Sequence, residues 1–205
     1  MTDAQIVIKR IDTETIRIPI VGTAPLMVNK FTEKSKRKML DDMQGRKSPK
    51  QIKDPQADYD AAFYRCDDGT PGFPVIAFKA ATVSAARFYG KEVSMTGLRQ
   101  FMFFDGEFSN VEGIQLARLI GEPHMREDAV KVGVNGRDLR YRPCFTTWTT
   151  TIDVVYVRAM LTRESVVSLV EAGGLGVGVG EWRPERRGDF GTYQVDSDRD
   201  VEVLA

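Results

Sequence analysis

The feature that most constrains the fold is the segment 173–191, which holds seven glycines, three arginines and a tryptophan. Glycine lets a backbone take positive φ and lets another part of the chain approach closely. The segment follows a helix-like run, 163–172, for which Thr162 is the expected N-cap. It precedes a strand-like run, 193–195. We therefore expect an irregular loop between a helix and a strand, with Gly173 ending the helix.

The second half of this loop carries the side chains that suit a nucleic acid. They are Trp182, Arg183, Arg186 and Arg187. Guanidinium groups and loop amides can contact phosphates, and an indole ring can stack on a base. The interpretation is that an extended, anionic, base-bearing polymer lies against the loop. In the alternative, the tryptophan plugs the core and the arginines pair with Glu181 and Glu185.

A second basic stretch lies between residues 30 and 53, with nine basic and three acidic residues. Over the 205 residues, 29 basic and 29 acidic residues cancel, which argues against a protein that coats nucleic acid by global charge. We expect one domain, 1–205, with 30–55 as a basic, mobile insertion. Lys30, Arg46 and Lys47 could close over a polynucleotide, although charge runs are usually only solvated.

The order of predicted elements is strand, helix, hairpin, strand, helix and strand, which indicates an α+β fold with a ferredoxin-like (RRM-like) core and inserted loops. The principal core helix is expected to start near Ala77. Its buried face is expected to hold four residues: Ile76, Ala80, Val83 and Ala86. Lys79 and Arg87 fall outside that face and are weaker candidates for binding a polynucleotide.

A hairpin is predicted over 129–142, because Asn135 and Gly136 form a turn signal between strand-prone residues. Arg137, Arg140 and Arg142 follow the turn. The hairpin could project and intercalate between nucleotides. Alternatively, it is an ordinary sheet edge whose arginines prevent aggregation.

The sequence contains no motif that predicts a catalytic site or a metal site. The alternate glycines of 174–180 lack the GK[ST] of a phosphate-binding loop and follow a helix instead of starting one. Two distant cysteines and a single histidine, His124, predict no zinc site, and no paired-carboxylate pattern predicts a two-metal nuclease. We expect no cofactor, no metal and no enzyme activity. With no signal peptide or membrane span in the sequence, the cytoplasm is the expected compartment.

Three motifs together resemble the repeat-associated RNA-binding (RAMP) superfamily, particularly the Cas7-type backbone subunit of CRISPR effector complexes. They are a strand running into 24–26, a loop entering the alanine-rich helix at 73–81, and a late strand, a helix and the glycine-rich segment 173–191. The resemblance implies an RRM-like core, binding of RNA or single-stranded DNA, and copies arranged in series. A stand-alone phage or mobile-element relative fits equally.

Three functions therefore remain open at this point. The first is a non-catalytic binder of RNA or single-stranded DNA that forms a homo-oligomer along the strand or joins a ribonucleoprotein. The second resembles the Cas6-type endoribonucleases, with His124 as the general acid and base. The third is a protein-interaction factor that mimics a CRISPR subunit. None of the three requires a membrane.

Overall fold

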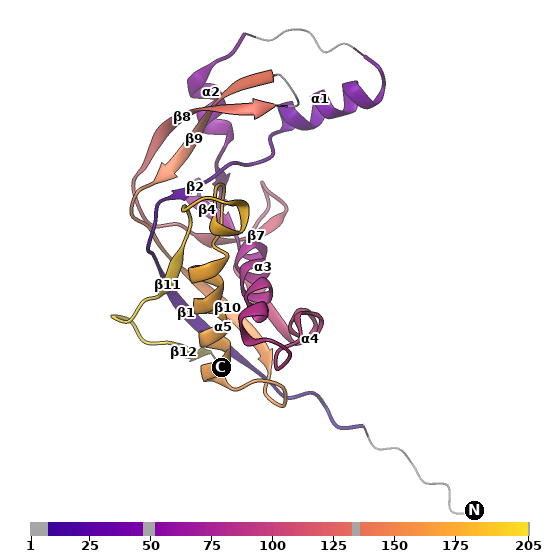
Figure 1. The fold of residues 1–205 in the computed structure, drawn as a ribbon, viewed down its shortest axis with the longest axis vertical. Helices are drawn as coiled ribbons and strands as arrows, with labels where there is room; N and C mark the ends of the chain where they lie inside the picture. Colours follow the sequence, from indigo (N-terminus) through magenta and orange to yellow (C-terminus); the bar gives the residue numbers. More distant parts are fainter. Residues whose placement is uncertain (1–7, 47–51, 133–135, 205) are drawn as a thin grey trace, which may run out of the picture.

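The computed structural model describes residues 8–46, 52–132 and 136–204, and Figure 1 shows their arrangement. Its central antiparallel sheet has the order β11-β1-β10-β5, with β12 also pairing with β1. The strands are β1 (Thr13–Gly22), β5 (Met102–Asp105), β10 (Thr149–Val157), β11 (Tyr193–Val195) and β12 (Glu202–Leu204). Helix α3 (Val75–Ala85) lies between β1 and β5 in the chain, and α5 (Arg163–Gly176) lies between β10 and β11. This arrangement is the ferredoxin-like core, so the predicted fold class is confirmed.

Alternation along β1 decides which face of the sheet is buried. Ile16, Ile18 and Ile20 are fully buried, whereas Arg17 between them is exposed. Ile18 pairs with Ile152 of β10, so side chains of like character meet on the same face. The three isoleucines therefore mark the core face, and Pro19 between two of them is buried as well.

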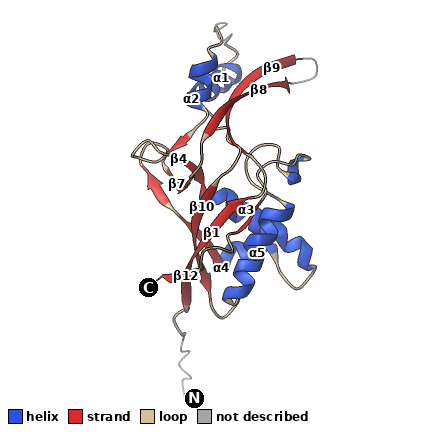
Figure 2. Cartoon of the chain, turned by 90° about the vertical axis from the view of Figure 1, so that its left-hand side faces the viewer, coloured by secondary structure: helices blue, strands red, loops and turns tan. Residues whose placement is uncertain are grey.

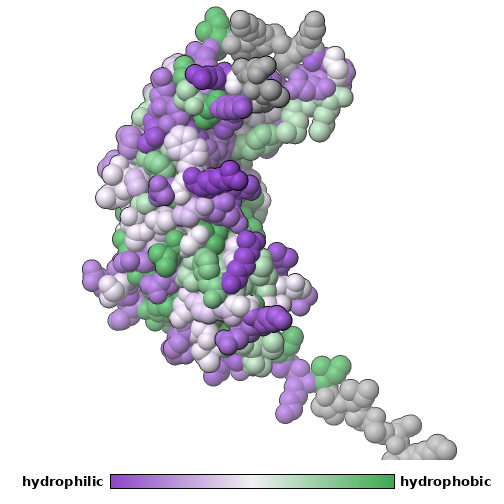
Figure 3. All heavy atoms as spheres, viewed as in Figure 1, coloured by the Kyte–Doolittle hydropathy of each residue, from purple (hydrophilic) through white to green (hydrophobic). Residues whose placement is uncertain are grey.

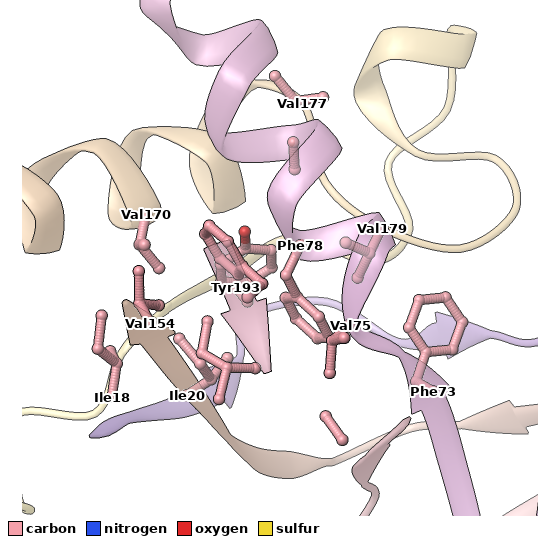
Figure 4. Close-up of a cluster of buried hydrophobic side chains, with 14 of the residues drawn as sticks. Ile18, Ile20, Phe73, Val75, Phe78, Val154, Val170, Val177, Val179 and Tyr193 are labelled. Atoms are coloured by element: carbon pink, nitrogen blue, oxygen red, sulfur yellow. The ribbon is translucent and has the colours of Figure 1, made fainter. Parts of the chain in front are cut away.

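Helices α3 and α5 cover that buried face (Figure 2). Figure 4 shows Phe78 of α3, Val170 of α5 and Tyr193 of β11 meeting above the isoleucines of β1. The ring centroids of Phe78 and Tyr193 are 5.3 Å apart. Two further short helices, η1 (Ala86–Tyr89) and α4 (Met95–Phe101), connect α3 to β5.

The expected end of α5 was wrong, because the helix continues through Gly173 as far as Gly176. The glycines serve close packing at this place. A Cβ on Gly173 would lie 2.8 Å from the backbone nitrogen of Thr82 in α3, and one on Gly174 would lie 2.0 Å from the carbonyl oxygen of Tyr193. They let α5 approach both α3 and β11. The predicted Thr162 cap is confirmed, since its hydroxyl accepts from the Ser165 amide.

The expected buried face of the core helix was also partly wrong. Val83 and Ala86 are buried as expected, but Ile76 is 65% exposed and Ala80 is exposed. The buried residues of α3 are Val75, Phe78, Ala81, Thr82, Val83 and Ala85. So many small and apolar residues leave a weak helical periodicity, which explains why the sequence placed the face wrongly.

A small antiparallel sheet extends the core, with the order β3-β4-β7-β6. Its strands are β3 (Tyr64–Arg65), β4 (Pro71–Pro74), β6 (Glu107–Ser109) and β7 (Ile114–Arg118). Strand β4 runs directly into α3, so this sheet is continuous with the core helix. At its edge, the Thr70 hydroxyl and Arg118 lower the pKa of Asp68.

A long hairpin projects from one end of the core (Figures 1 and 2). It consists of β8 (Pro123–Val132) and β9 (Gly136–Phe145), with β2 (Leu26–Met27) paired to the base of β9. The predicted hairpin at 129–142 is therefore confirmed and longer than expected, while Asn135 of its predicted turn lies outside the described residues. Helices α1 (Glu33–Met43) and α2 (Pro55–Ala61) lie at the same end.

Helix α1 lies within the basic insertion, and Thr32 caps it by accepting from the Ser35 amide. None of its residues is buried. A salt bridge of 2.5 Å joins Lys53 to Asp138 of β9, so part of the insertion contacts the hairpin. Within the described ranges, the structure contains no helix with the length and apolar character needed to cross a membrane.

Candidate nucleic-acid interface

The loop after α5 is folded tightly onto the start of the chain. The Glu181 amide donates to the Met27 carbonyl at 3.0 Å, and the Gly191 amide donates to the Pro25 carbonyl at 2.8 Å. A Cβ on Gly180 would lie 2.6 Å from the Met27 carbonyl oxygen, and Gly180 has φ +78°. These amides are hydrogen-bonded within the protein. The expectation that they contact phosphates is therefore wrong for Glu181 and Gly191, because their donors already have partners.

A cluster of charges around the buried Arg142 joins this loop to the base of the hairpin, and we call it the junction cluster. Arg142 of β9 is 1% exposed, and its two terminal nitrogens donate to Asp128 of β8 at 2.8 Å and to Glu181 of the loop. Asn29 also donates to Glu181, and Arg140 lies 3.9 Å from the same carboxylate. Such pairing is what a buried guanidinium needs, because an unpaired buried charge is strongly unfavourable.

Trp182 belongs to the same junction. The guanidinium carbon of Arg126 lies 5.4 Å from its ring centroid and that of Arg142 lies 5.1 Å away. Phe190 packs edge-on against the indole at 5.9 Å. The backbone at Trp182 has φ +55°, an unfavourable region for a bulky side chain. These contacts bury Trp182 only in part and leave it outside the hydrophobic core, so its position differs both from an open stacking surface and from a tryptophan that plugs the core.

A short turn follows the tryptophan, built on η2 (Pro184–Arg186). Arg183 begins it and is paired, because it donates to Glu185 at 2.9 Å and to the Gly180 carbonyl at 3.1 Å. Arg186 and Arg187 lie at the far side of the turn and are exposed. Neither forms an ion pair with the described residues. A strongly hydrophilic patch covers this turn in Figure 3.

The shape of the η2 turn is fixed by its backbone. The Gly188 amide donates to the Arg183 carbonyl at 3.2 Å, and the Phe190 amide donates to the Trp182 carbonyl at 3.0 Å. Gly188 lies so close to Trp182 that a Cβ would be 1.9 Å from the tryptophan carbonyl oxygen. Arg187 has φ +64°. The hydrogen-bonded backbone of this turn therefore presents two guanidinium groups, of Arg186 and Arg187, that form no ion pair with described residues.

The remaining predicted contacts divide into paired and unpaired side chains. Lys30 forms a salt bridge of 2.6 Å with Glu112, and Lys79 donates to the Arg99 carbonyl while lying 4.9 Å from the Phe103 ring centroid. Burial lowers the pKa of Lys79, which was expected to point outward. Three predicted cations are exposed and form no ion pair with described residues: Arg46, Arg87 and Arg137. Lys47 lies outside the described residues.

The sequence interpretation missed three residues of this region. Arg126 and Asp128 take part in the junction cluster, and Lys131 lies directly across the hairpin from Arg137. Exposed and without an ion pair in the described part of the chain, Lys131 adds to the positive charge near the hairpin end. The hairpin register carried the necessary signal, because it places Arg126 opposite Arg142 and Asp128 opposite Arg140.

His124 is exposed on β8 and makes no hydrogen bond or ion pair with described residues. Cys144 lies directly across from it on β9. Burial raises the pKa of the Cys144 thiol, which disfavours the nucleophilic thiolate. Within the described ranges, no three His, Cys, Asp or Glu side chains are grouped to hold a metal ion.

No protein-family model and no curated protein sequence matches the chain. Among solved structures, it is similar to the crystal structure of Cmr6 from Pyrococcus furiosus, with a TM-score of 0.47 and 11% sequence identity. The match covers 91% of this chain and 100% of the other.

Proposed function

We propose that the chain is a distant RAMP relative that binds RNA or single-stranded DNA along its backbone without cleaving it. One observation carries the proposal: Arg186 and Arg187 are exposed and free of ion pairs with described residues, on a turn that the surrounding backbone closes. A guanidinium group held in this way can contact phosphate without first breaking an internal salt bridge.

Contact with the backbone, in place of the bases, is proposed because the aromatic ring next to the η2 turn already has partners within the protein. Trp182 has Arg126, Arg142 and Phe190 around its ring. The binding proposed is therefore tolerant of sequence, because phosphate contacts carry no base information.

The exposed face of the central sheet supports the same choice of site. In an RRM this face stacks bases on aromatic side chains. Here, Arg17 of β1 donates two hydrogen bonds of 2.8 Å to Asp153 of β10, and the pair lies on that face. This ion pair leaves no free cation at the centre of the face, although Phe103 of β5, 45% exposed, lies on the same face. The strand proposed here lies across the η2 turn and the hairpin, where the cations without ion pairs to described residues are.

Several copies side by side along one strand complete the proposal. Support for this arrangement comes from the resemblance of the three sequence motifs to a family whose members bind guide RNA in series. It also fits the balanced charge of the chain, since 29 basic and 29 acidic residues leave copies without strong mutual repulsion.

The proposal is tested by fluorescence anisotropy with a labelled single-stranded RNA and a matched single-stranded DNA. The double variant Arg186→Ala/Arg187→Ala should lose roughly tenfold to a hundredfold in affinity, since two charge-assisted contacts disappear. Arg199→Ala is the matched control, because this arginine is paired with Asp196. Unchanged affinity in the double variant would defeat the site.

The other functions give different results in the same preparation. A strand-binding protein should co-purify with nucleic acid, whereas a protein-interaction factor should co-purify with protein alone. Intact RNA after incubation with wild type and with His124→Ala would support binding without catalysis. Cleavage that disappears in His124→Ala would establish the endoribonuclease instead.

A further inference from the structure

We propose that Arg142 is a positioning residue: through the junction cluster it holds the η2 turn and the hairpin end in one fixed arrangement, so that both contact the same strand. This inference rests on the proposed function and adds a second contact surface to it. That surface consists of Lys131 and Arg137, which are exposed cross-strand neighbours near the end of the hairpin.

The cluster connects three separate parts of the chain through one guanidinium. Arg142 belongs to β9, Asp128 to β8 and Glu181 to the loop after α5. Both carboxylates accept from different terminal nitrogens of Arg142. Since Arg142 is 1% exposed, water has little access to replace a lost partner, and moving the hairpin base away from the loop would leave Arg142 with one of its two carboxylates.

The backbone next to the cluster gives a second, independent reason. Trp182 has φ +55°, and this unfavourable conformation persists only where surrounding contacts determine it. Arg126 and Arg142 lie near its ring, and the η2 turn begins at the next residue. The conformation at Trp182 sets the direction in which the turn leaves the junction.

A fixed arrangement of two cationic surfaces has a measurable consequence for binding. When two contact surfaces are held in place, the second contact forms with little further loss of conformational freedom. When the η2 turn and the hairpin can move relative to each other, part of the binding free energy of the second contact is lost in fixing their relative positions. The hairpin cations should therefore contribute fully only while the junction cluster is intact.

The experiment measures what Lys131 and Arg137 contribute in two backgrounds. With a labelled single-stranded RNA, Lys131→Ala/Arg137→Ala should weaken binding by roughly tenfold in the wild-type protein. In the Arg142→Met background, the same pair should weaken binding by less than about threefold. An equal fold-change in both backgrounds would overturn the inference, because a purely structural role changes stability without changing this ratio.

Two additional variants keep the test decisive if Arg142→Met does not fold. Glu181→Gln keeps the size of the side chain and removes the loop's charge from the cluster, and it should also reduce the hairpin contribution. Arg142→Lys keeps the charge but lacks the two-pronged geometry, so its effect should be intermediate. If wild-type protein binds no strand, the proposed function fails as well; if it binds and the ratio is constant, only the inference fails.

Discussion

The junction cluster and the η2 turn adjoin where Glu181 is followed by the turn, yet they use arginine in opposite ways. In the cluster, Arg142 is buried and shared between two carboxylates. In the turn, Arg186 and Arg187 are exposed and form no ion pair with described residues. The comparison teaches that a concentration of arginines does not by itself mark a binding surface. The partners of each guanidinium decide its role.

The largest expected difference between the two regions is the effect of losing an arginine on the free energy of unfolding. Arg142→Met removes the buried partner of Asp128 and Glu181, which keep only the more exposed Arg126 and Arg140 as cationic partners, so we expect the free energy of unfolding to fall by about 3 kcal/mol. Arg186→Ala should change it by no more than about 0.5 kcal/mol, as is usual for an exposed side chain. Urea denaturation followed by circular dichroism measures both. Similar losses of unfolding free energy in Arg142→Met and Arg186→Ala would contradict the distinction between a structural arginine in the cluster and a surface arginine in the turn.

Substitutions of Trp182 test whether this side chain stabilises the fold or binds the strand. Trp182→Ala removes the ring that Arg126, Arg142 and Phe190 surround, and we expect a loss of about 2 kcal/mol in the free energy of unfolding. Trp182→Phe should lose less, because part of the packing remains. Denaturant unfolding measures stability, and anisotropy measures strand binding. A large loss of affinity with unchanged stability would instead make Trp182 a base-stacking residue.

Lowering the pH should reduce the stability of the fold while leaving the charge of the arginines in the η2 turn unchanged, and this effect should be smaller than those of the substitutions above. Hydrogen bonds from Arg163 and Tyr156 lower the pKa of Glu14, and those from Thr70 and Arg118 lower that of Asp68. A lowered carboxyl pKa stabilises the fold above the ordinary value, roughly 4, and this stability is lost as pH falls through the lowered value. Arginine keeps its charge throughout this range.

Unfolding in urea at pH 7 and at pH 3 measures this dependence, with Glu14→Gln as the variant that should show a smaller decrease. Strand affinity between pH 8 and pH 5 should stay nearly constant, because guanidinium groups do not titrate there. A fold with equal stability at pH 7 and pH 3 would contradict the contribution assigned to Glu14 and Asp68.

The sequence allowed part of the core to be predicted, where a local signal is strong. Thr162 marked the start of α5, whereas the weak periodicity of α3 led to a wrong buried face. The end of α5 was predicted wrongly at Gly173, since glycine in a sequence signals both a helix end and a close approach between elements. Only the packing against α3 and β11 shows which of the two applies.

The candidate site was harder to predict for a related reason. Composition identified the arginines but could not tell which of them were neutralised. Arg142 and Glu181 are 39 residues apart in the chain, and their pairing depends on how the hairpin base meets the loop. Asp128 was missed because its partner lies across a hairpin whose register the sequence did not establish. Only the fold therefore shows which charged residues, distant in the chain, pair with each other.

The salt dependence of strand binding tests the central claim most directly. For wild type, the logarithm of the affinity for single-stranded RNA should fall linearly with the logarithm of the salt concentration. Removing Arg186 and Arg187 together should make this slope shallower by about 1.4, or about 0.7 for each lost phosphate contact. An unchanged slope would show that these arginines do not meet the strand and would contradict the account.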